Sequence, residues 1–499
     1  MAYQWFGDLI TCRDWSHLWL NEGFASYFDI LFQEVDKGRD IALKSIYDSQ
    51  HNIVTSDIGD WRRPSVFANY VNPNDMFDNR IYGKGACVLH MLRFILGDEL
   101  FWKAINHYVN AFAFHVVETN DFKIAVEEAT GYNLHWFFDE WLYKAGYPEF
   151  DITSTWDEAS HTVTVDVKQS QKIDSLTGLF VIPVEIEVWT HDVPQTYRVM
   201  ISKQEEQFSF PSYQEPQLVL FDKGSQILKK ANFHKSIDAS IFQLKHAENG
   251  VDRIDAIEDL RWLVDSNQVT EALSNAAIDD RFSEVRREAV WALGDAKKQD
   301  VSGLLMKAYG DSEAKVRAAA IAGLKTYKGN AVIQLLQHAF GQDSSYVVAG
   351  TALTALMKID TVNAKTYAQG GLSRDSFRES IRIAALRGLA DVRDDEAFRL
   401  VKQCTDYGND RNVRMEALGL LSRKWKDRPD VVAHLISFIT DASFHVRRAV
   451  MEMLGNVGNP QAIAPLQTVV DLETDTRLVK VARDAIEKIK QGLPEHGVH

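Results

Sequence analysis

The side chains of this 499-residue chain that could do chemistry are concentrated near its start. Glu22, in the segment L-W-L-N-E-G-F-A, supplies a carboxylate that can bind a metal ion, and Tyr3 and Tyr82 supply phenol hydroxyls. A catalytic zinc site takes about three protein ligands, chosen from histidine, cysteine and carboxylate side chains. One carboxylate without histidine partners cannot compete with water and cellular chelators for zinc. A phenol, with a pKa of about 10, is a poor replacement for a histidine.

The segment around Glu22 resembles the zinc site of the M1 aminopeptidases, a family of gluzincin metallopeptidases. In this family two histidines in H-E-x-x-H and a glutamate in W-L-N-E-G-F-A bind zinc, and the glutamate of H-E-x-x-H is the general base. The family spacing, counted back from Glu22 over the stretch from Asn21 to Gln4, places Tyr3 where the second histidine is expected. The first histidine and the catalytic glutamate would precede residue 1. The resemblance therefore implies that Glu22 is the remaining zinc ligand and that Tyr3 stands at the position of a lost one.

A second segment carries the same resemblance. Residues 79–86 read N-R-I-Y-G-K-G-A and are similar to the Y-E-K-G-A segment of the family, whose tyrosine donates a hydrogen bond to the oxyanion of the tetrahedral intermediate. Tyr82 matches that tyrosine, whereas Gly83 replaces the usual glutamate. E-T-N-D-F at 118–122 and W-F-F-D-E-W at 136–141 resemble the end of the thermolysin-like domain of the family.

Two functions from different classes follow. The resemblance implies a fragment of an M1-type zinc metallopeptidase, an aminopeptidase that uses Zn²⁺ to remove N-terminal residues from peptides. Because the first histidine, the catalytic glutamate and the second histidine are missing or replaced, we expect this chain to be inactive on its own and not to retain zinc. The alternative is a non-catalytic scaffold that binds a protein partner through its helical repeats. A separate N-terminal fragment that completes the catalytic domain is a further partner consistent with the resemblance.

Composition limits the remaining classes. Hydrophobic residues make up 45% of the chain, which is enough for several buried cores. The net charge of -15 leaves no basic footprint for a nucleic acid. No apolar run approaches the roughly 18 residues of a membrane-spanning helix, and Cys12, Cys87 and Cys404 have neither metal-ligand nor redox spacing. We therefore expect a soluble protein, cytoplasmic as the sequence stands, with no nucleic-acid partner and no membrane span.

The hydrophobic periodicity changes along the chain and predicts a mainly α protein with a small β-sandwich. Residues 1–147 have helical spacing, and the resemblance makes them the distal, C-terminal half of a thermolysin-like peptidase domain. Residues 148–234 alternate with period two, as in T-V-T-V-D-V and P-V-E-I-E-V, and predict the β-sandwich. Residues 235–499 predict an α-solenoid of HEAT-like repeats.

The solenoid prediction depends on a helix with the pattern V-R-x-x-A that recurs at nearly constant intervals. The anchor positions are Arg253, Arg286, Arg317, Val348, Arg382, Arg414, Arg447 and Lys480. Aspartates shortly before most anchors, such as Asp280, Asp343 and Asp441, are predicted to cap the turn or the helix that carries the anchor. Neither helix of one hairpin can bury its apolar face alone, so stacked hairpins share one continuous core.

Overall fold

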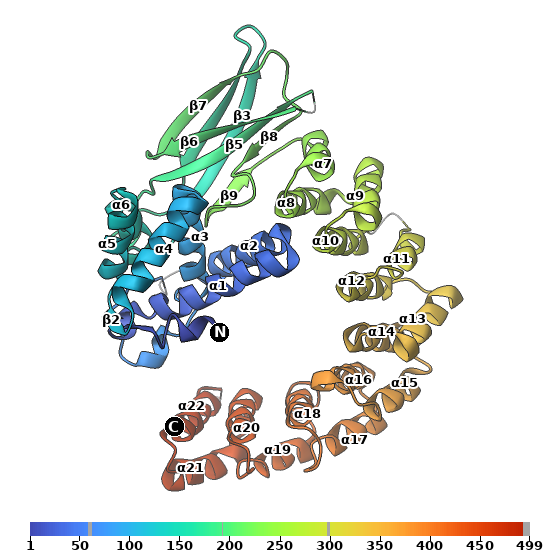
Figure 1. The fold of residues 1–499 in the computed structure, drawn as a ribbon. Coiled ribbons are helices and arrows are strands. Elements are labelled where there is room, and N and C mark those ends of the chain that lie inside the picture. The colour runs from blue at the N-terminus through green and yellow to red at the C-terminus, as the bar shows by residue number, and fades with distance from the viewer. Residues whose placement is uncertain (58–61, 192, 297–299, 493–499) are drawn as a thin grey trace, which may run out of the picture. The chain divides into compact units, whose positions relative to one another are not determined.

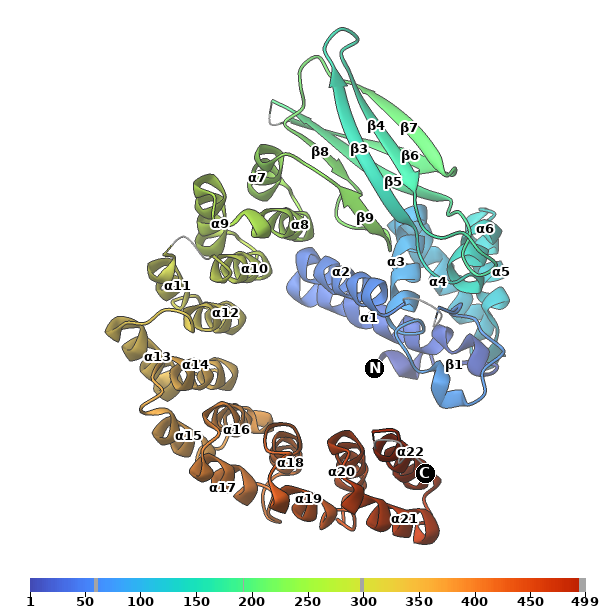
Figure 2. The same ribbon diagram turned by 180° about the vertical axis from the view of Figure 1, so that it is seen from behind.

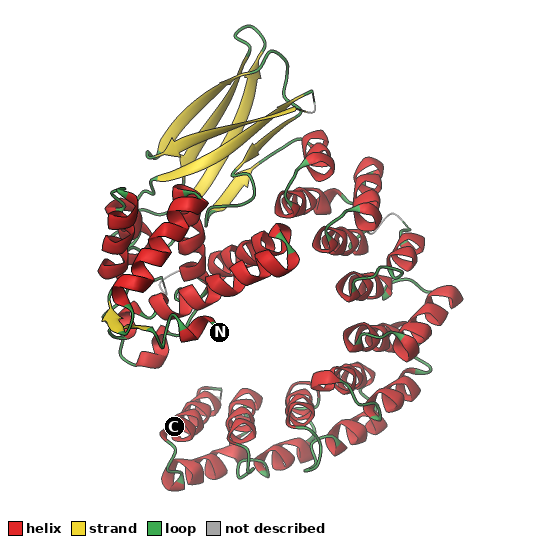
Figure 3. Cartoon of the chain, in the orientation of Figure 1, coloured by secondary structure: helices red, strands yellow, loops and turns green. Residues whose placement is uncertain are grey.

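The computed structural model describes residues 1–57, 62–191, 193–296 and 300–492. They form two compact units, Met1–Ala292 and Leu293–His499. Helices predominate in both units, and the sheets belong to the first (Figure 1, Figure 3). The predicted fold, mainly α with a small β-sandwich and a helical repeat region, is therefore confirmed. The boundary between the units lies among the helical hairpins, and the three-domain division at 147 and 234 stays a prediction.

The first unit begins with a helical region. Its elements are η1 (Ala2–Gln4), β1 (Ile10–Cys12), η2 (Trp15–His17), α1 (Trp19–Lys37), α2 (Arg39–Ser56), η4 (Pro73–Met76), α3 (Gly83–Leu96), α4 (Asp98–Phe112), β2 (His115–Val117), α5 (Thr119–Thr130), α6 (His135–Phe138) and the π-helix η5 (Asp139–Tyr143). Short strands β1 and β2 pair in parallel. Helices α1 and α3 pack against each other at the centre of this region, where the residues of interest lie.

Aromatic side chains fill the core of the helical region. Phe24 of α1 contacts Trp19, Tyr108 and Phe122, with ring centroids 5.9, 5.8 and 5.0 Å away, and none of these four side chains has measurable exposure. Edge-to-face and tilted pairs of this kind add about 0.5–1.5 kcal/mol each to the stability gained from burial. The rings therefore hold α1, α4 and α5 in fixed relation to one another.

A two-sheet sandwich follows. Its strands are β3 (Glu149–Asp157), β4 (Thr162–Gln169), β5 (Ile182–Thr190), β6 (Val193–Ile201), β7 (Glu205–Pro211), β8 (Leu218–Phe221) and β9 (Lys230–Phe233). One sheet has the order β7-β4-β3-β9 and the other β6-β5-β8, and the neighbouring strands are antiparallel except for the parallel pair β3 and β9 (Figure 2). Val163, Val165 and Val167 alternate inward on β4, as the period of two predicted.

Helical hairpins make up the rest of both units. The first unit contains α7 (Ile237–His246), α8 (Gly250–Leu260), η6 (Arg261–Leu263), α9 (Asn267–Asp279) and most of α10 (Ser283–Gly294). The second contains α11 (Ser302–Ala308), α12 (Ala314–Leu324), α13 (Asn330–Gln342), α14 (Tyr346–Ile359), α15 (Ala364–Leu372), η7 (Phe377–Glu379), α16 (Ser380–Val392), α17 (Asp395–Gln403), α18 (Arg411–Lys424), α19 (Pro429–Ile436), α20 (Phe444–Val457), η8 (Pro460–Ala462), α21 (Ile463–Leu472) and α22 (Thr476–Gln491). Each anchor position lies on the second helix of a hairpin.

Several anchor arginines, among them Arg253, Arg317 and Arg414, form ion pairs with the capping aspartate of the following repeat. Arg317 of α12 pairs with Asp343 through two nitrogens, each 2.9 Å from a carboxylate oxygen, and Arg414 pairs with Asp441 of the following repeat. Asp343 also accepts a hydrogen bond from the backbone N–H of Ser345 at 2.8 Å, just before α14. The aspartates thus cap the turn, as predicted, and in addition receive the arginine of the preceding repeat.

Val348 breaks this pattern and shows how it works. Because a valine occupies that anchor position, Asp375 has no arginine from the preceding anchor to receive. It pairs instead with Arg382 of its own repeat, which also binds Glu379 at 2.7 Å.

No helix of the described part of the chain is long and apolar enough to span a bilayer.

Candidate active site

Glu22 lies in the first turn of α1 and is almost completely buried, with 8% of its surface exposed. The approach to the helix is fixed by Asp14, whose side chain caps η2 by accepting the backbone N–H of Ser16 at 2.8 Å. Behind Glu22, the indole N–H of Trp19 donates to the hydroxyl of Thr119 at 2.8 Å. The start of α1 is therefore held from both sides, and the carboxylate has a fixed position.

Tyr3 lies beside Glu22. Its hydroxyl donates a hydrogen bond to Oε2 of Glu22 at 2.5 Å, although the two residues are far apart along the chain. Phe6 anchors the segment that carries Tyr3, because its buried ring packs on those of Phe24 and Phe28 with centroids 4.4 and 4.8 Å away. Tyr3 itself is half exposed, so solvent reaches one side of the pair.

Tyr82 completes the group because α1 and α3 cross at two glycines. A Cβ atom added to Gly85 would lie 2.8 Å from the Cα of Gly23, and one added to Gly23 would lie 2.9 Å from the Cα of Gly85. Only glycine permits so close a contact between helix backbones. Tyr82 is the residue immediately before α3, and Glu22 precedes Gly23, so the crossing places the phenol of Tyr82 next to the carboxylate of Glu22.

The charges at the site favour neutral phenols around one carboxylate. Partial burial, the hydrogen bond to Glu22 and the negative charge of Glu22 together raise the pKa of Tyr3 above its usual value. Burial and the same negative charge raise the pKa of Tyr82. Both hydroxyls therefore stay protonated near neutral pH and act as donors. Among the described residues, no lysine, arginine or histidine forms an ion pair with Glu22.

The donor set does not fit a zinc ion. In the described part of the chain no three histidine, cysteine, aspartate or glutamate side chains come close enough to hold a metal. The two side chains that hydrogen-bond the carboxylate of Glu22 in the described structure, Tyr3 and Tyr82, are phenols, which zinc sites rarely use and which are here neutral donors toward the carboxylate. The roles expected from the resemblance, zinc ligand for Glu22 and oxyanion donor for Tyr82, remain predictions.

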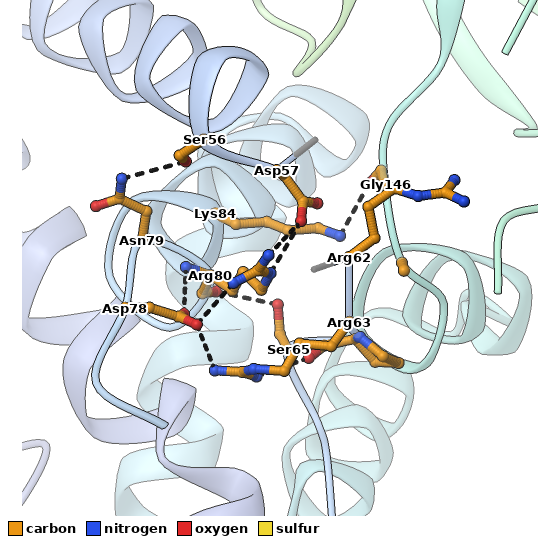
Figure 4. Close-up of polar contacts among 12 residues, drawn as sticks. Ser56, Asp57, Arg62, Arg63, Ser65, Asp78, Asn79, Arg80, Lys84 and Gly146 are labelled. Atoms are coloured by element: carbon orange, nitrogen blue, oxygen red, sulfur yellow. Dashed lines mark hydrogen bonds and ion pairs between the residues drawn. The ribbon is translucent and has the colours of Figure 1, made fainter. Parts of the chain in front are cut away.

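Lys84 lies in the first turn of α3, two residues after Tyr82, and the sequence analysis did not predict a role for it. Its side chain has no measurable exposure, and its ammonium donates to the carbonyl of Gly146 at 2.9 Å (Figure 4). Burial lowers the pKa of Lys84 to about 8. Beside it, Arg80 binds Asp57 at 2.7 Å and Asp78 at 2.8 Å. The lysine of the Y-G-K-G-A segment was the available signal, because it closely follows Tyr82 in the sequence.

Two histidines near the site have structural partners. Nδ1 of His17 lies 3.0 Å from the hydroxyl of Thr119. Nε2 of His90 lies 2.9 Å from Oε1 of Gln226, and burial lowers the pKa of His90 to about 4. His90 is therefore neutral near pH 7, and both histidines have the partners of structural side chains.

Comparison with known proteins agrees with this geometry. Residues 1–141 match the model of the peptidase family M1 domain, and residues 270–357 and 400–487 match that of HEAT repeats. A probable aminopeptidase 1 of Saccharolobus solfataricus is 29% identical over 197 residues, 38% of this chain and 24% of that protein. Aminopeptidase M1-A of Oryza sativa subsp. japonica is 26% identical over 292 residues, 57% of this chain and 30% of that protein.

The fold is also that of a solved aminopeptidase. The crystal structure of Legionella pneumophila aminopeptidase A in complex with aspartic acid matches 97% of this chain and 64% of that one, with a TM-score of 0.68 and 15% identity. Residues 1–141 are accordingly similar to the M1 peptidase domain, and residues 270–357 and 400–487 are similar to HEAT repeats. The chain spans less than a third of the length of the two curated relatives described.

Proposed function

We propose that this chain is an M1 aminopeptidase-type protein that binds peptides or proteins and has no zinc-dependent peptidase activity. The observation that carries the proposal is the hydrogen bond from Tyr3 to Glu22. The resemblance assigns the carboxylate of Glu22 to zinc, and in this chain that carboxylate accepts a hydrogen bond from Tyr3. Tyr3 itself stands where a histidine ligand is expected. M1 peptidases in general depend on zinc, so this substitution removes the group on which their chemistry depends.

The decisive experiment is hydrolysis of amino-acid arylamides by the full chain, with and without added zinc. The expected result is no turnover above the rate in buffer, for the wild type and for Glu22→Gln alike. Turnover that a chelator abolishes, that zinc restores and that Glu22→Gln removes would contradict the proposal. In that case the chain is an active aminopeptidase despite Tyr3.

The HEAT repeats favour a scaffold role in the absence of hydrolysis. The ion pairs between repeats, Arg317 with Asp343 and Arg414 with Asp441, fix the stacking of neighbouring hairpins. A rigid array of this kind presents one extended surface, which is how repeat proteins bind their partners. The same arylamide assay separates the scaffold role from an active aminopeptidase, because a scaffold shows no turnover under any metal condition.

A further inference from the structure

A second cavity, of about 420 Å³, lies in the first unit and contains neither Glu22 nor Tyr82 in its wall. Its wall comes mainly from α2, from the segment that runs through β8 and β9, and from α7 and α8. Helix α8 packs against both α2 and α7, and α7 packs against β8, so these contacts fix the wall (Figure 1, Figure 2). Small-molecule sites have volumes of roughly 300–1,000 Å³, so the cavity is large enough for a ligand.

Two lysines supply positive charge to this cavity and are held in place. The side chains of Lys229 and Lys235 line it and are only 11% and 10% exposed. Lys229 binds Asp222 at 2.5 Å and a serine hydroxyl at 3.4 Å. Lys235 binds Asp259 at 2.9 Å and Oε1 of Gln243 at 2.6 Å. Because an ammonium group has three N–H donors, each lysine keeps one donor beyond these described partners.

Helix α8 supplies a carboxylate with one open oxygen. Oδ1 of Asp255 accepts the hydroxyl of Tyr47 at 2.7 Å, and both residues line the cavity. Oδ2 of Asp255 has no partner among the described residues, and neither Lys229 nor Lys235 forms an ion pair with Asp255. Burial raises the pKa of Asp255, and the charges of the two lysines only partly offset this effect. Opposite charges therefore line one cavity without pairing with each other.

We infer that this cavity binds a small zwitterion, such as a free amino acid or a dipeptide. Its ammonium group would pair with Asp255, and its carboxylate with Lys229 and Lys235. A ligand with one charge would meet a like charge in the wall and leave the opposite one unpaired. Leu220 and Phe221 also line the cavity, so we expect an apolar side chain on the ligand.

The test measures binding of four molecules to the full chain by isothermal titration calorimetry, with a chelator present so that metal ions do not contribute. Leucine carries both charges, and alanyl-leucine carries them further apart. Isocaproate is leucine without its ammonium group, and isopentylamine is leucine without its carboxylate. We expect leucine or the dipeptide to bind about tenfold or more tightly than either singly charged analogue. The tighter of the two zwitterions identifies the source of the ligand.

Variants locate the site. Asp255→Asn removes the charge and keeps an oxygen for Tyr47, and Lys235→Met removes one ammonium group. We expect each to weaken binding of the zwitterion about tenfold or more. Lys245→Met is the matched control, because Lys245 is exposed on α7 and does not line the cavity. It should bind the zwitterion like the wild type, and so should Glu22→Gln.

The comparison with the singly charged analogues uses the wild type, so it stands even if a variant folds poorly. Isocaproate or isopentylamine that binds as tightly as the zwitterions would overturn the inference, because one charge would then suffice. Absence of binding by all four molecules would overturn it too. Zwitterion binding that is lost in Glu22→Gln and kept in Asp255→Asn would place the ligand at the candidate active site instead. None of these results bears on zinc-dependent hydrolysis, which the arylamide assay tests separately.

Discussion

The candidate site and the repeats solve the same problem, a buried charge, in different ways. In the repeats Asp441 is buried, and Arg414 from the preceding repeat neutralises its charge in an ion pair. Ion pairs of the same kind recur between other neighbouring repeats. At the candidate site Glu22 is equally buried and has two phenols but no cation among the described residues. A charge that is compensated inside the fold contributes to architecture. The charge of Glu22 is stabilised instead by hydrogen bonds from neutral phenols.

Removal of a compensating arginine gives the largest expected effect. Arg414→Leu leaves Asp441 buried without its partner, and we expect it to lower the free energy of opening of α18 and α20 by about 3–5 kcal/mol. Hydrogen exchange of the backbone amides in these two helices measures the change. Arg387→Leu is the control: Arg387 is 61% exposed and pairs with Glu416, so the loss should stay below about 1 kcal/mol. Equal effects of the two variants would refute the distinction between compensating and surface arginines.

Asp252, in the first hairpin, is a buried carboxyl that is hydrogen-bonded but has no ion pair among the described contacts. It accepts hydrogen bonds from the backbone N–H of Gly224 and from Asn249, and burial raises its pKa from 3.8 to about 7. Between pH 4 and pH 7 the carboxyl of Asp252 is therefore protonated in the folded chain and ionised in the unfolded chain. Its contribution to the stability of the first unit is lost as the pH rises through that range. We expect a loss of about 3 kcal/mol that is absent in Asp252→Asn.

Urea denaturation at pH 4.5 and at pH 7.5, followed by tryptophan fluorescence, measures this difference. Trp425 is the one tryptophan of the second unit, so the signal comes mainly from the first. If the wild type and Asp252→Asn lose stability in parallel over this range, the carboxyl of Asp252 is not the group that titrates.

The crossing of α1 and α3 predicts a smaller but position-specific effect. Gly85→Ala forces a methyl group to within 2.8 Å of the Cα of Gly23, and we expect it to destabilise the first unit by about 1–3 kcal/mol. Gly83→Ala is the matched control in the same helix, because its nearest atom is 3.7 Å away, and it should be neutral or slightly stabilising. The fluorescence-detected urea midpoint reports both. A Gly85→Ala protein as stable as Gly83→Ala would show that the helices adjust without cost.

Loss of a single hydroxyl gives the smallest effect. Tyr3→Phe removes the donor to Glu22 and should cost about 1 kcal/mol or less in stability, because Tyr3 is half exposed and water can replace it. The same denaturation assay checks this. A cost as large as that of Gly85→Ala would mean that the hydrogen bond from Tyr3 is needed to hold the first unit together.

Much of the architecture was predictable because it depends on local periodicity. Burial of one face of each strand explains the period of two in 148–234, and the structure has strands there. Burial of one face of each helix explains the regular recurrence of the anchor helix after residue 235, and the structure has hairpins there. The resemblance also singled out Glu22 and Tyr82, whose roles as zinc ligand and oxyanion donor stay predictions. Capping by Asp343 was predicted, whereas its ion pair with Arg317 was not, since the two residues belong to different repeats.

The sequence by itself determined the kinds of element, the repeat and the residue types available near Glu22, because short-range spacing sets which side chains share a face. Only the tertiary structure decided that Gly23 and Gly85 touch, that Lys84 is buried against Gly146, and that the hydroxyl of Tyr3 reaches Glu22. These contacts join segments far apart in the chain, and their existence depends on how the helices pack. The missing countercharge of Glu22 is likewise a property of the packed site, since the chain contains 55 lysines and arginines and the fold brings none of the described ones to this carboxylate.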